Sequence, residues 1–579
     1  MAAPQVHAHT SANGDVHQAE SSPKISPTSI PSQARQILTN SIINNESLNI
    51  PKAVKDLTSN VVFAPEVEPF LPTSLKMSES ASALWATIGL FANAICKERY
   101  STEEPKKITV DVYSATLMLA SVFLFEVDGK HFIESKAVPR AIHLDKGTMR
   151  ETYRNVISNV YKTADGKFYH LHGSLNADPT LNMLGLPLHR PDLQGDIEAS
   201  KDVYRSVVGA RDSKSIEIEA NERWRQPGAT CLTMDHFSAT PHGKVNIQDP
   251  LYKITTTNDH LPPTAWPQVG KKDRSLAGIK VLDLTKVIAG PTVTRVLALM
   301  GADVLRVSAE AQPEALIFIS DGQIGKRDTD INIKTTEGKH QLDKLIAEAD
   351  VIVSSYRPGT FEKFGLGREW AHELARRRGK GLVYCRENCY GWNGEWSHRA
   401  GYQQISDAVT GASWEQGKFL GLDEPVMPLL PNSDSQTGLT GAISIMHALL
   451  LRSTTGGSYN ISISLNQFNN WFLRNVGLHS PSVQTSLRAL HPDLNLRHDT
   501  GIFEMAPVVM AATKRTNAEM WDKKRFTKGV MRWGVEGEEA VYLDWRGIVR
   551  VEGMGGEELV ELGFEYGSCR PGSDQARFL

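Results

Sequence analysis

Cysteine is scarce in this 579-residue sequence, and its placement does not support a disulfide-built fold. The five cysteines are spread over the chain, and an odd number at wide spacings forms no framework of paired thiols. Cys385 and Cys389 lie close together, but no second cysteine pair or histidine cluster is near them. We therefore expect no zinc site and no other metal. Free thiols fit a reducing compartment, so we expect a cytoplasmic protein.

Long apolar segments are also missing. The longest apolar run, around residues 115–125, is about half as long as a membrane-spanning helix, and the N-terminus has no apolar signal region. The net charge of -3 is close to neutral for a chain of this length. Neither a membrane nor a nucleic acid is therefore expected as a partner.

Two nucleotide-binding signatures are absent as well. The first strand of the α/β pattern described below is followed by residues 285–291, which lack the G-x-G-x-x-G pattern of dinucleotide-binding folds. The chain also has no Walker A sequence, whose glycine-rich loop would hold the phosphates of ATP. NAD binding and ATP hydrolysis therefore lose support as functions.

The length of the chain predicts several packed units. Residues 1–60 are interpreted as a disordered tail, because the first forty are rich in Ser, Pro, Ala, Gln and His. A proline-rich and polar stretch at 262–275 separates two larger units. We expect a unit at 61–265 that includes a small α+β domain, a second unit at 276–475, and a C-terminal extension at 476–579.

The second unit alternates between apolar strands and amphipathic helices. This alternation predicts a Rossmann-like open sheet of mostly parallel strands, whose ligands bind beyond the carboxyl ends of the strands. The predicted strands are 279–284, 303–307, 330–333, 350–354 and 381–385, and the predicted helices are 292–300, 336–348 and 368–377.

The chain also contains a partial internal repeat. Residues 433–438 begin a long apolar helix that leads to a strand, and residues 78–83 begin a similar helix that also leads to a strand. Each helix has a carboxylate at its start, Asp434 in the later copy and Glu79 in the earlier one. We interpret Glu79 as a helix cap.

Asp434 has two interpretations. Aspartate is among the best N-capping residues, so a cap is the ordinary meaning of this pattern. The start of a helix also favours a negative charge, and an ionised carboxylate there could attack an activated acyl group. Gly438 and Gly441 would let a ligand or another segment approach the same helix closely.

Several basic residues lie near the predicted ligand edge of the sheet. They form either a solvated surface or a set of phosphate-binding groups. They are Lys326, Arg327, Lys334, Arg357 and Lys363.

Residues 276–291, continuing to 300–304, resemble the opening of the family III CoA-transferases, the CaiB/BaiF class. The segment Asp434–Gly438 then falls where that family keeps its catalytic aspartate. Between these two points, further segments agree with the family in the same order: 325–327, 331–334, 356–359, 364–367, 382–385 and 400–402.

The N-terminal half is similar to the later part of the same family. Residues 161–168 resemble the opening of the family's small domain, and residues 240–251 resemble its closing segment. The chain therefore looks like the back half of one subunit joined to the front half of another, an arrangement that resembles fused, fungal-type members.

The resemblance implies a CoA-transferase that moves CoA from an acyl-CoA to a small carboxylic acid, without a metal and as a homodimer. It implies that Asp434 is the nucleophile, forming a mixed anhydride and then an aspartyl-CoA thioester. It also implies CoA contacts along the first-strand loop, around the adenine and at a phosphate. The residues implied for these contacts are Val287 and Ala289; Ile331, Lys334, Ser355 and Tyr356; and Lys363.

Some positions depart from the family pattern. Ser308–Glu310 and Asn388 replace residues that are acidic or basic in many members, and residues 173–184 contain no glycine-rich shielding loop. Tyr402 stands where racemases of the family carry a histidine. Two alternatives therefore stay open: an acyl-CoA racemase or isomerase, which Tyr402 disfavours, and a non-catalytic CoA-binding relative.

Overall fold

The computed structural model describes residues 26–101, 107–146, 150–257, 259–269, 274–534, 539–552 and 562–579. Residues 1–25 of the expected tail and residues 270–273 of the expected linker lie outside these ranges.

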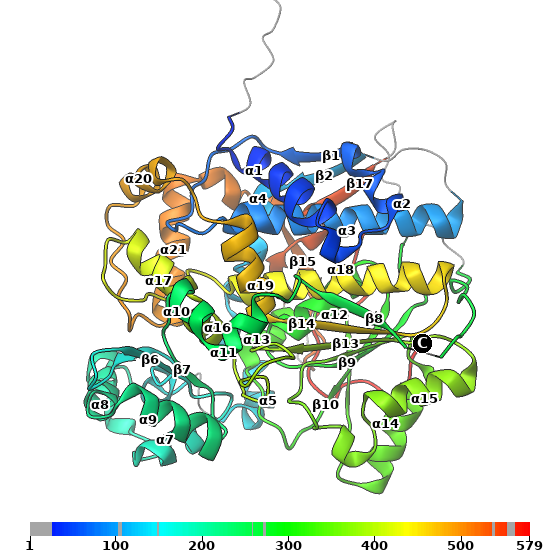
Figure 1. The fold of residues 1–579 in the computed structure, drawn as a ribbon. Helices are drawn as coiled ribbons and strands as arrows, with labels where there is room; N and C mark the ends of the chain where they lie inside the picture. Colours follow the sequence, from blue (N-terminus) through cyan, green and yellow to red (C-terminus); the bar gives the residue numbers. More distant parts are fainter. Residues whose placement is uncertain are drawn as a thin grey trace, which may run out of the picture.

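A seven-stranded sheet forms the centre of the molecule (Figure 1). Its strand order is β11-β10-β9-β12-β13-β14-β8, and every neighbouring pair is parallel except β14 with β8. The predicted α/β class with an open, mostly parallel sheet is thus confirmed. The strands are β8 Lys253–Thr256, β9 Lys280–Leu284, β10 Asp303–Ser308, β11 Arg327–Asp330, β12 Val351–Ser354, β13 Val383–Asn388 and β14 Tyr459–Ser464.

Helices cover both faces of this sheet, because alternate strand residues point to opposite sides. Val281 and Val353 belong to the core shared with α12 (Ala289–Leu299) and α18 (Asn432–Thr454). Leu282 and Ile352 belong to the core shared with α14 (Thr336–Glu348) and α15 (Arg368–Arg378). In Figure 1, α12 and α18 lie above the sheet, and α14 and α15 lie below it.

Helix α18 packs unusually close to α12. A Cβ atom on Gly438 would lie 2.4 Å from the Cβ of Thr292, and one on Gly441 would lie 2.6 Å from Val293. These glycines therefore admit a neighbouring helix, which fixes the start of α18 against the loop that follows β9.

One strand prediction was wrong. Apolar alternation suggested a strand at 330–333, but β11 is the more polar segment Arg327–Asp330. Arg327 and Asp328 are buried with partners, such as Asp303 for Arg327 at 2.7 Å, so an apolar pattern could not indicate this strand. Residues 331–334 are instead the loop at the carboxyl end of β11.

The expectation of disorder was wrong for residues 30–60. This segment contains α1 (Ile30–Gln36), a π-helical turn (Ile37–Ile43) and α2 (Lys52–Lys55). Ile30, Leu38 and other apolar side chains of the segment are buried in the main core. The polar composition of residues 1–40 led to the prediction of disorder, although apolar residues from Ile30 onward pack into the core.

The internal repeat is visible as two similar successions of elements. Helix α3 (Met77–Tyr100) leads to β2 (Lys107–Asp111) and α4 (Val112–Met118), as α18 leads to β14 and α19 (Leu465–Trp471). Glu79 and Asp434 are each the third residue of their helices. Helices α3 and α18 lie side by side (Figure 1).

Segments from the two ends of the chain share smaller sheets. Strand β17 pairs with β2, and β16 pairs with β3, so residues 61–265 and 476–579 interleave in space. The boundaries proposed for the units stay predictions. The strands of these sheets are β1 Val61–Ala64, β3 Glu126–Val127, β4 Lys130–His131, β15 Phe526–Val530, β16 Glu539–Leu543 and β17 Val549–Glu552.

A small α+β region forms a separate lobe (lower left in Figure 1). Its antiparallel sheet has the order β5-β6-β7 and is covered by α7, α8 and α9. The bounds are β5 Val160–Lys162, β6 Phe168–Leu171, β7 Gly228–Thr230, α7 Asp178–Leu184, α8 Ile197–Gly209 and α9 Ser213–Ile218.

The remaining α-helices connect these parts, and none of the helices in the described ranges is long and apolar enough to cross a membrane. The remaining helices are α5 Val138–Ala141, α6 Thr152–Asn155, α10 Met234–Ala239, α11 Pro241–Asn246, α13 Leu316–Gly322, α16 Gln403–Thr410, α17 Ala412–Phe419, α20 Pro481–Leu490 and α21 Ile502–Thr516.

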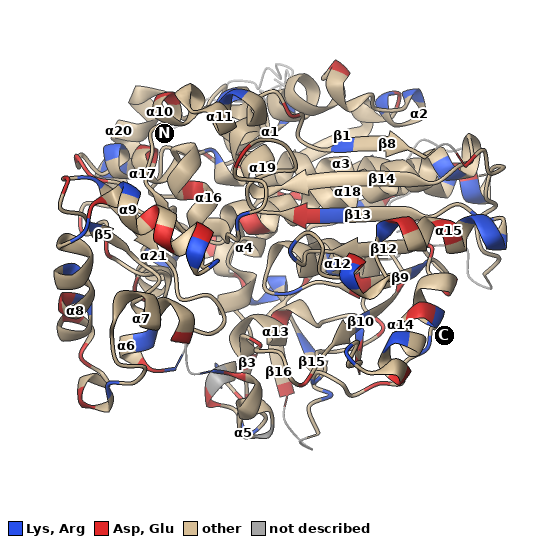
Figure 2. Ribbon diagram, turned by 60° about the horizontal axis from the view of Figure 1, so that its bottom comes forward, with Lys and Arg blue, Asp and Glu red and all other residues tan. Residues whose placement is uncertain are grey.

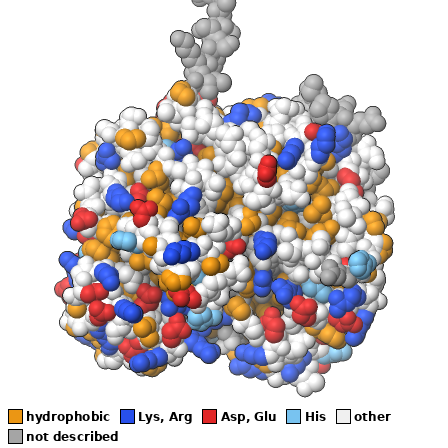
Figure 3. Space-filling view, viewed as in Figure 1, with side chains coloured by type: hydrophobic (Ala, Val, Ile, Leu, Met, Phe, Trp, Pro, Cys, Tyr) orange, Lys and Arg blue, Asp and Glu red, His pale blue; other side chains and the backbone are white. Residues whose placement is uncertain are grey.

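Charged residues lie mainly on the helices and loops around the large sheet (Figure 2), and both signs are interspersed on the face shown in Figure 3.

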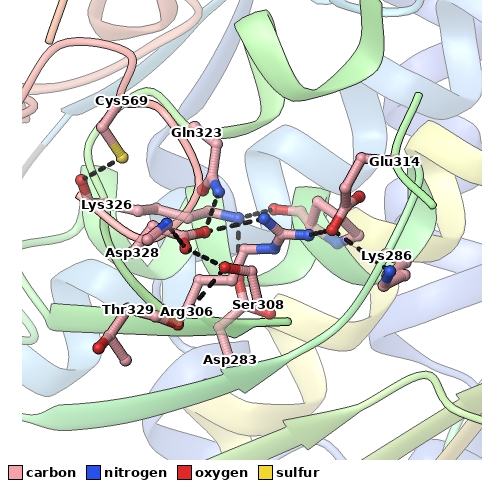
Figure 4. Close-up of polar contacts among 12 residues, drawn as sticks. Asp283, Lys286, Arg306, Ser308, Glu314, Gln323, Lys326, Asp328, Thr329 and Cys569 are labelled. Carbon is pink, nitrogen blue, oxygen red and sulfur yellow. Dashed lines mark hydrogen bonds and ion pairs between the residues drawn. The ribbon is translucent and has the colours of Figure 1, made fainter. Parts of the chain in front are cut away.

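A buried charge cluster joins β9, β10 and β11 (Figure 4). Lys326 Nζ lies 3.0 Å from Asp283 Oδ2, and both side chains are fully buried. Arg306 lies between Asp328, at 2.8 Å, and Glu314, at 2.6 Å. Burial favours the neutral acid at Asp283, but Lys326 and neighbouring hydroxyl groups together hold the pKa of Asp283 below its ordinary value.

The C-terminal residues close the edge of the sheet beside this cluster. The backbone N–H of Gly572 donates to Asp328 Oδ1 at 2.7 Å, and the N–H of Asp574 donates to the carbonyl of Asp328 at 2.7 Å. The N–H of Leu579 donates to Asp303 Oδ2 at 2.8 Å. This tail therefore covers edge strand β11, whose backbone groups would otherwise face solvent.

Replacing Lys326 with Met tests how far the fold depends on the cluster. The fully buried Asp283 carboxylate would lose its ion pair, and breaking one partner of a buried pair costs about 3–5 kcal/mol. We expect Lys326→Met to lower the free energy of unfolding by about that amount in a denaturant titration.

The matched control combines Lys326→Met with Asp283→Asn. The amide oxygen of Asn still accepts a hydroxyl hydrogen bond, and no charge is left unpaired, so this double variant should recover part of the lost stability. Identical denaturation midpoints for the wild type and Lys326→Met would show that the pair does not support the fold.

Candidate active site

A cavity of about 560 Å³ opens at the carboxyl ends of the parallel strands. It lies where an open α/β sheet places its ligands, because the loops after β9, β10, β11, β12 and β13 all contribute to its wall. All eight residues singled out from the sequence line this one cavity: Val287, Ala289, Ile331, Lys334, Ser355, Tyr356, Lys363 and Asp434. The roles assigned to them stay predictions.

Asp434 lies in the first turn of α18, but it is not the N-cap. The helix begins at Asn432 and Pro431 is the capping residue, so the capping interpretation was wrong. The backbone N–H of Asp434 donates to Gln403 Oε1 at 3.3 Å. Its carboxylate forms no hydrogen bond or ion pair with any described residue, and the residue is 9% exposed. The carboxylate is therefore available to a ligand in the cavity.

The electrostatic surroundings of Asp434 oppose its ionisation. Burial raises the pKa of Asp434 well above its ordinary value, and the carboxyl groups of Glu387 and Asp407 add to this rise. The positive end of the α18 dipole acts in the opposite direction. Asp407 itself is held by Ser433 Oγ at 2.6 Å and Asn469 Nδ2 at 2.9 Å. A desolvated carboxylate with no partner of its own is a more reactive nucleophile than a solvated one.

Glu387 is a second acidic group in the cavity, and the sequence analysis missed it. It lies near the carboxyl end of β13, is 7% exposed, and has no hydrogen bond or ion pair with the described residues. Burial raises the pKa of Glu387 to about 8. Its position near the end of a predicted strand, at the edge of the sheet where ligands bind, is the sequence signal that could have indicated it.

The loop after β9 forms a strained wall of the cavity. Val287 has a φ of 71°, in the left-handed region that a β-branched residue rarely adopts and that costs about 1–3 kcal/mol. Lys286 beside it is held by Glu314 at 3.3 Å and by the carbonyl of Pro313 at 2.9 Å. The Lys286 ammonium is therefore already neutralised by the protein.

Three other cations remain for an anionic ligand. Lys334, Arg357 and Lys363 line the cavity, are exposed, and form no ion pair within the described ranges. Lys326 and Arg327, considered with them from the sequence, are instead buried in ion pairs of the fold. The basic rim that could meet phosphates is thus smaller than the sequence suggested and lies after β11 and β12.

The small lobe of the N-terminal half completes the site. Ser174 follows strand β6 and its Oγ lies 2.8 Å from Tyr402 Oη. The ring of His172 stacks on Tyr402 at 4.4 Å with an interplanar angle of 3°. The two halves therefore meet within one chain, and the lobe brings a histidine to a position that no local motif around Tyr402 indicated.

His172 is held as a neutral ring. Its Nδ1 accepts the N–H of Ser174 at 2.9 Å, which leaves Nε2 to carry the proton. Burial, with a contribution from His170, lowers the pKa of His172 to about 3. A neutral ring whose Nδ1 is already occupied does not serve as a proton-abstracting base.

Glu79, the counterpart of Asp434 in the repeat, has a different environment. It is 1% exposed, its Oε1 atom is fully buried, and it lines none of the cavities described here. Its nearest basic partner is His479 at 3.6 Å, whose pKa burial lowers to about 3. Lys76 is the N-cap position of its helix, so the expectation that Glu79 caps this helix was also wrong.

Comparisons with known proteins identify the same family as the sequence motifs, CoA-transferase family III. A sequence model described as CoA-transferase family III matches residues 276–486. The "Acetyl-coenzyme A transferase nodX" of Hypoxylon pulicicidum is 33% identical over 558 residues, which cover 94% of this chain and 93% of that protein. An "Acyl-CoA transferase" of Gibberella moniliformis is 33% identical over 72% of this chain and 75% of its own length.

Another relative matches a smaller share of the chain. The "Succinyl-CoA:glutarate CoA-transferase" of Mus musculus is 34% identical over 33% of this chain and 45% of its own length. The Hypoxylon alignment, in contrast, runs through both halves, so the rearranged order of this chain is shared with that protein. On these matches, the protein is a transferase enzyme that belongs to CoA-transferase family III.

Proposed function

We propose that this enzyme transfers CoA from an acyl-CoA to a free carboxylic acid, with Asp434 as the nucleophile. The observation that carries the proposal is the Asp434 carboxylate, which faces the 560 Å³ cavity at a helix start without a partner among the described residues. The names of the relatives, which include acetyl-CoA, acyl-CoA and succinyl-CoA transferases, support a substrate of this class.

The proposed reaction begins with attack of an Asp434 oxygen on the thioester carbonyl. The C–S bond breaks, the CoA thiolate leaves, and a mixed anhydride forms between Asp434 and the acyl group. The thiolate then attacks the Asp434 carbonyl of the anhydride, which releases the first carboxylate and leaves an aspartyl-CoA thioester. An oxygen of the acceptor carboxylate attacks the carbonyl of this thioester, the C–S bond breaks, and the CoA thiolate leaves as a second mixed anhydride forms between Asp434 and the acceptor. The thiolate then attacks the acceptor carbonyl of this anhydride, which forms the new acyl-CoA and releases the Asp434 carboxylate.

The CoA moiety would lie along the main cavity. Lys334 and Lys363, together with Arg357, supply exposed positive charge for its phosphates. Ile331 and Tyr356 supply apolar surface suited to the adenine ring. We also propose a cytoplasmic location and a homodimer, which rest on the composition and the family resemblance alone.

Removing the nucleophile tests the mechanism. Asp434→Asn keeps the shape of the side chain but removes its nucleophilic charge, so we expect transfer to fall by at least about a thousandfold. Hydroxylamine added during turnover should modify Asp434 in the wild type, as read by mass spectrometry of the peptide that contains it.

Glu79→Gln is the matched control, because Glu79 occupies the corresponding third position of the other repeat helix. Its transfer rate should equal that of the wild type. Full activity in Asp434→Asn, or hydroxylamine modification only at another carboxylate, would rule out the proposed nucleophile.

A second test concerns pH. Transfer needs ionised Asp434, whose pKa is raised, so kcat/KM should fall as the pH drops and Asp434 takes up a proton. Replacing Glu387 with Gln removes one of the carboxyl groups that oppose this ionisation. We therefore expect the acidic limb of the pH profile of kcat/KM to move to lower pH in Glu387→Gln.

Glu395→Gln is the control, since Glu395 is exposed in the loop that follows β13. Its acidic limb should coincide with that of the wild type. A limb that stays in place in Glu387→Gln would mean that Glu387 does not raise the pKa of Asp434.

A further inference from the structure

Asp434 borders a second, smaller space besides the main cavity. This space measures about 60 Å³ and shares part of its wall with the main cavity. Asp434 is one of the shared residues, so its carboxylate lies between the two spaces. The other shared residues are Ser174, Leu175, Val287, Ile288 and Tyr402.

The lining of the smaller space differs in charge from that of the main cavity. The described residues that line it include no Lys or Arg, whereas those of the main cavity include Lys334, Arg357 and Lys363. Its one histidine, His172, is neutral for the reasons given above. The lining residues that it does not share with the main cavity are apolar or uncharged: Asn155, Ser158, Asn159, His172, Phe318, Gln404, Gly501, Ile502 and Phe503.

The smaller space borders an apolar groove. Phe503 also lines a hollow of about 220 Å³, and Phe318 of the smaller space directly follows Ile317 of the groove. Phe503 contacts Phe123 edge to face, with ring centroids 6.2 Å apart. Apart from His131, every residue of the groove is apolar: Phe123, Ile317, Phe503, Ala506, Pro507 and Met510.

The wall that carries Phe503 is fixed to the small lobe. Glu504, next to Phe503 in α21, forms an ion pair with Lys201 at 2.9 Å and accepts the N–H of Gly501 at 3.1 Å. Just before this helix, Asp499 Oδ2 accepts from Arg205 Nε at 2.9 Å. These ion pairs with the small lobe therefore set the position of Phe503. Phe503 itself lies outside residues 276–486, which match the family model.

We infer that the smaller space binds the acyl chain of the thioester, that Phe503 separates this space from the groove, and that the substrate is an uncharged, apolar acyl-CoA. This inference rests on the proposed function, because it places the acyl group on the side of Asp434 away from the cationic rim. An apolar chain would cover apolar side chains and gain from leaving water. A terminal carboxylate, as in a succinyl group, would be desolvated there without a cation to pair with.

Donor selectivity tests the inference. With one fixed acceptor acid, we expect hexanoyl-CoA to exceed succinyl-CoA in kcat/KM by about a hundredfold or more, because the described lining offers no cation to pair with the second carboxylate. Phe503→Ala should join the two spaces and raise kcat/KM for decanoyl-CoA relative to hexanoyl-CoA by about tenfold. Phe503→Arg should instead raise succinyl-CoA relative to hexanoyl-CoA.

Val508→Ala is the matched control, because Val508 lies on the same helix and is 45% exposed. Its ratios should equal those of the wild type. Binding of hexanoyl-CoA and succinyl-CoA to Asp434→Asn, measured by calorimetry, gives a second readout that does not require transfer.

The outcomes separate the two proposals. Preference for succinyl-CoA in the wild type, or unchanged chain-length ratios in Phe503→Ala, would overturn the acyl pocket while leaving CoA transfer through Asp434 intact. Absence of transfer from every donor, with tighter binding of hexanoyl-CoA to Asp434→Asn, would overturn the proposed function and support the pocket. Equal or weaker binding of hexanoyl-CoA than of succinyl-CoA would overturn the pocket.

Discussion

The buried charges that join β9, β10 and β11 hold one side of the ligand cavity in place. Asp283 and Lys326 have no access to water, and a buried charge is tolerated only when its partner stays in place. Glu314 binds both Arg306 and Lys286, so the same cluster also fixes the loop after β9. The Glu314–Lys286 ion pair therefore holds the loop that contains strained Val287. The positive charge available to a ligand comes from the loops after β11 and β12.

Two close contacts then place the nucleophile proposed here. Gly438 lets α18 approach α12, which brings the start of α18 to the loop after β9. The small lobe approaches from the other side and brings Ser174 and His172 against Tyr402. Asp434 therefore lies where the Rossmann-like half meets the small lobe, and a ligand that reaches it has one half of the chain on each side.

Much of this arrangement was predictable from residue patterns. Apolar runs and helical periodicity located four of the five strands predicted in the Rossmann-like half, and the rule that ligands bind at the carboxyl ends placed all eight chosen residues in one cavity. Local patterns failed where charge was paired over long distances: Arg327 begins a strand only because Asp303 neutralises it. Likewise, His172 reaches Tyr402 only through the packing of the small lobe against the Rossmann-like half, so no spacing in the sequence indicates it.

The internal repeat shows why position alone does not identify a nucleophile. Glu79 and Asp434 occupy the same place in matching helices, and burial raises the pKa of both carboxyl groups. The difference between them is access. The loops after β9, β10 and β12 open the cavity in front of Asp434, whereas Glu79 belongs to the copy whose sheet, β1-β2-β17, lacks those loops. A carboxylate that no thioester can reach cannot attack one, so of the two carboxylates Asp434 alone has the access that the proposed chemistry requires.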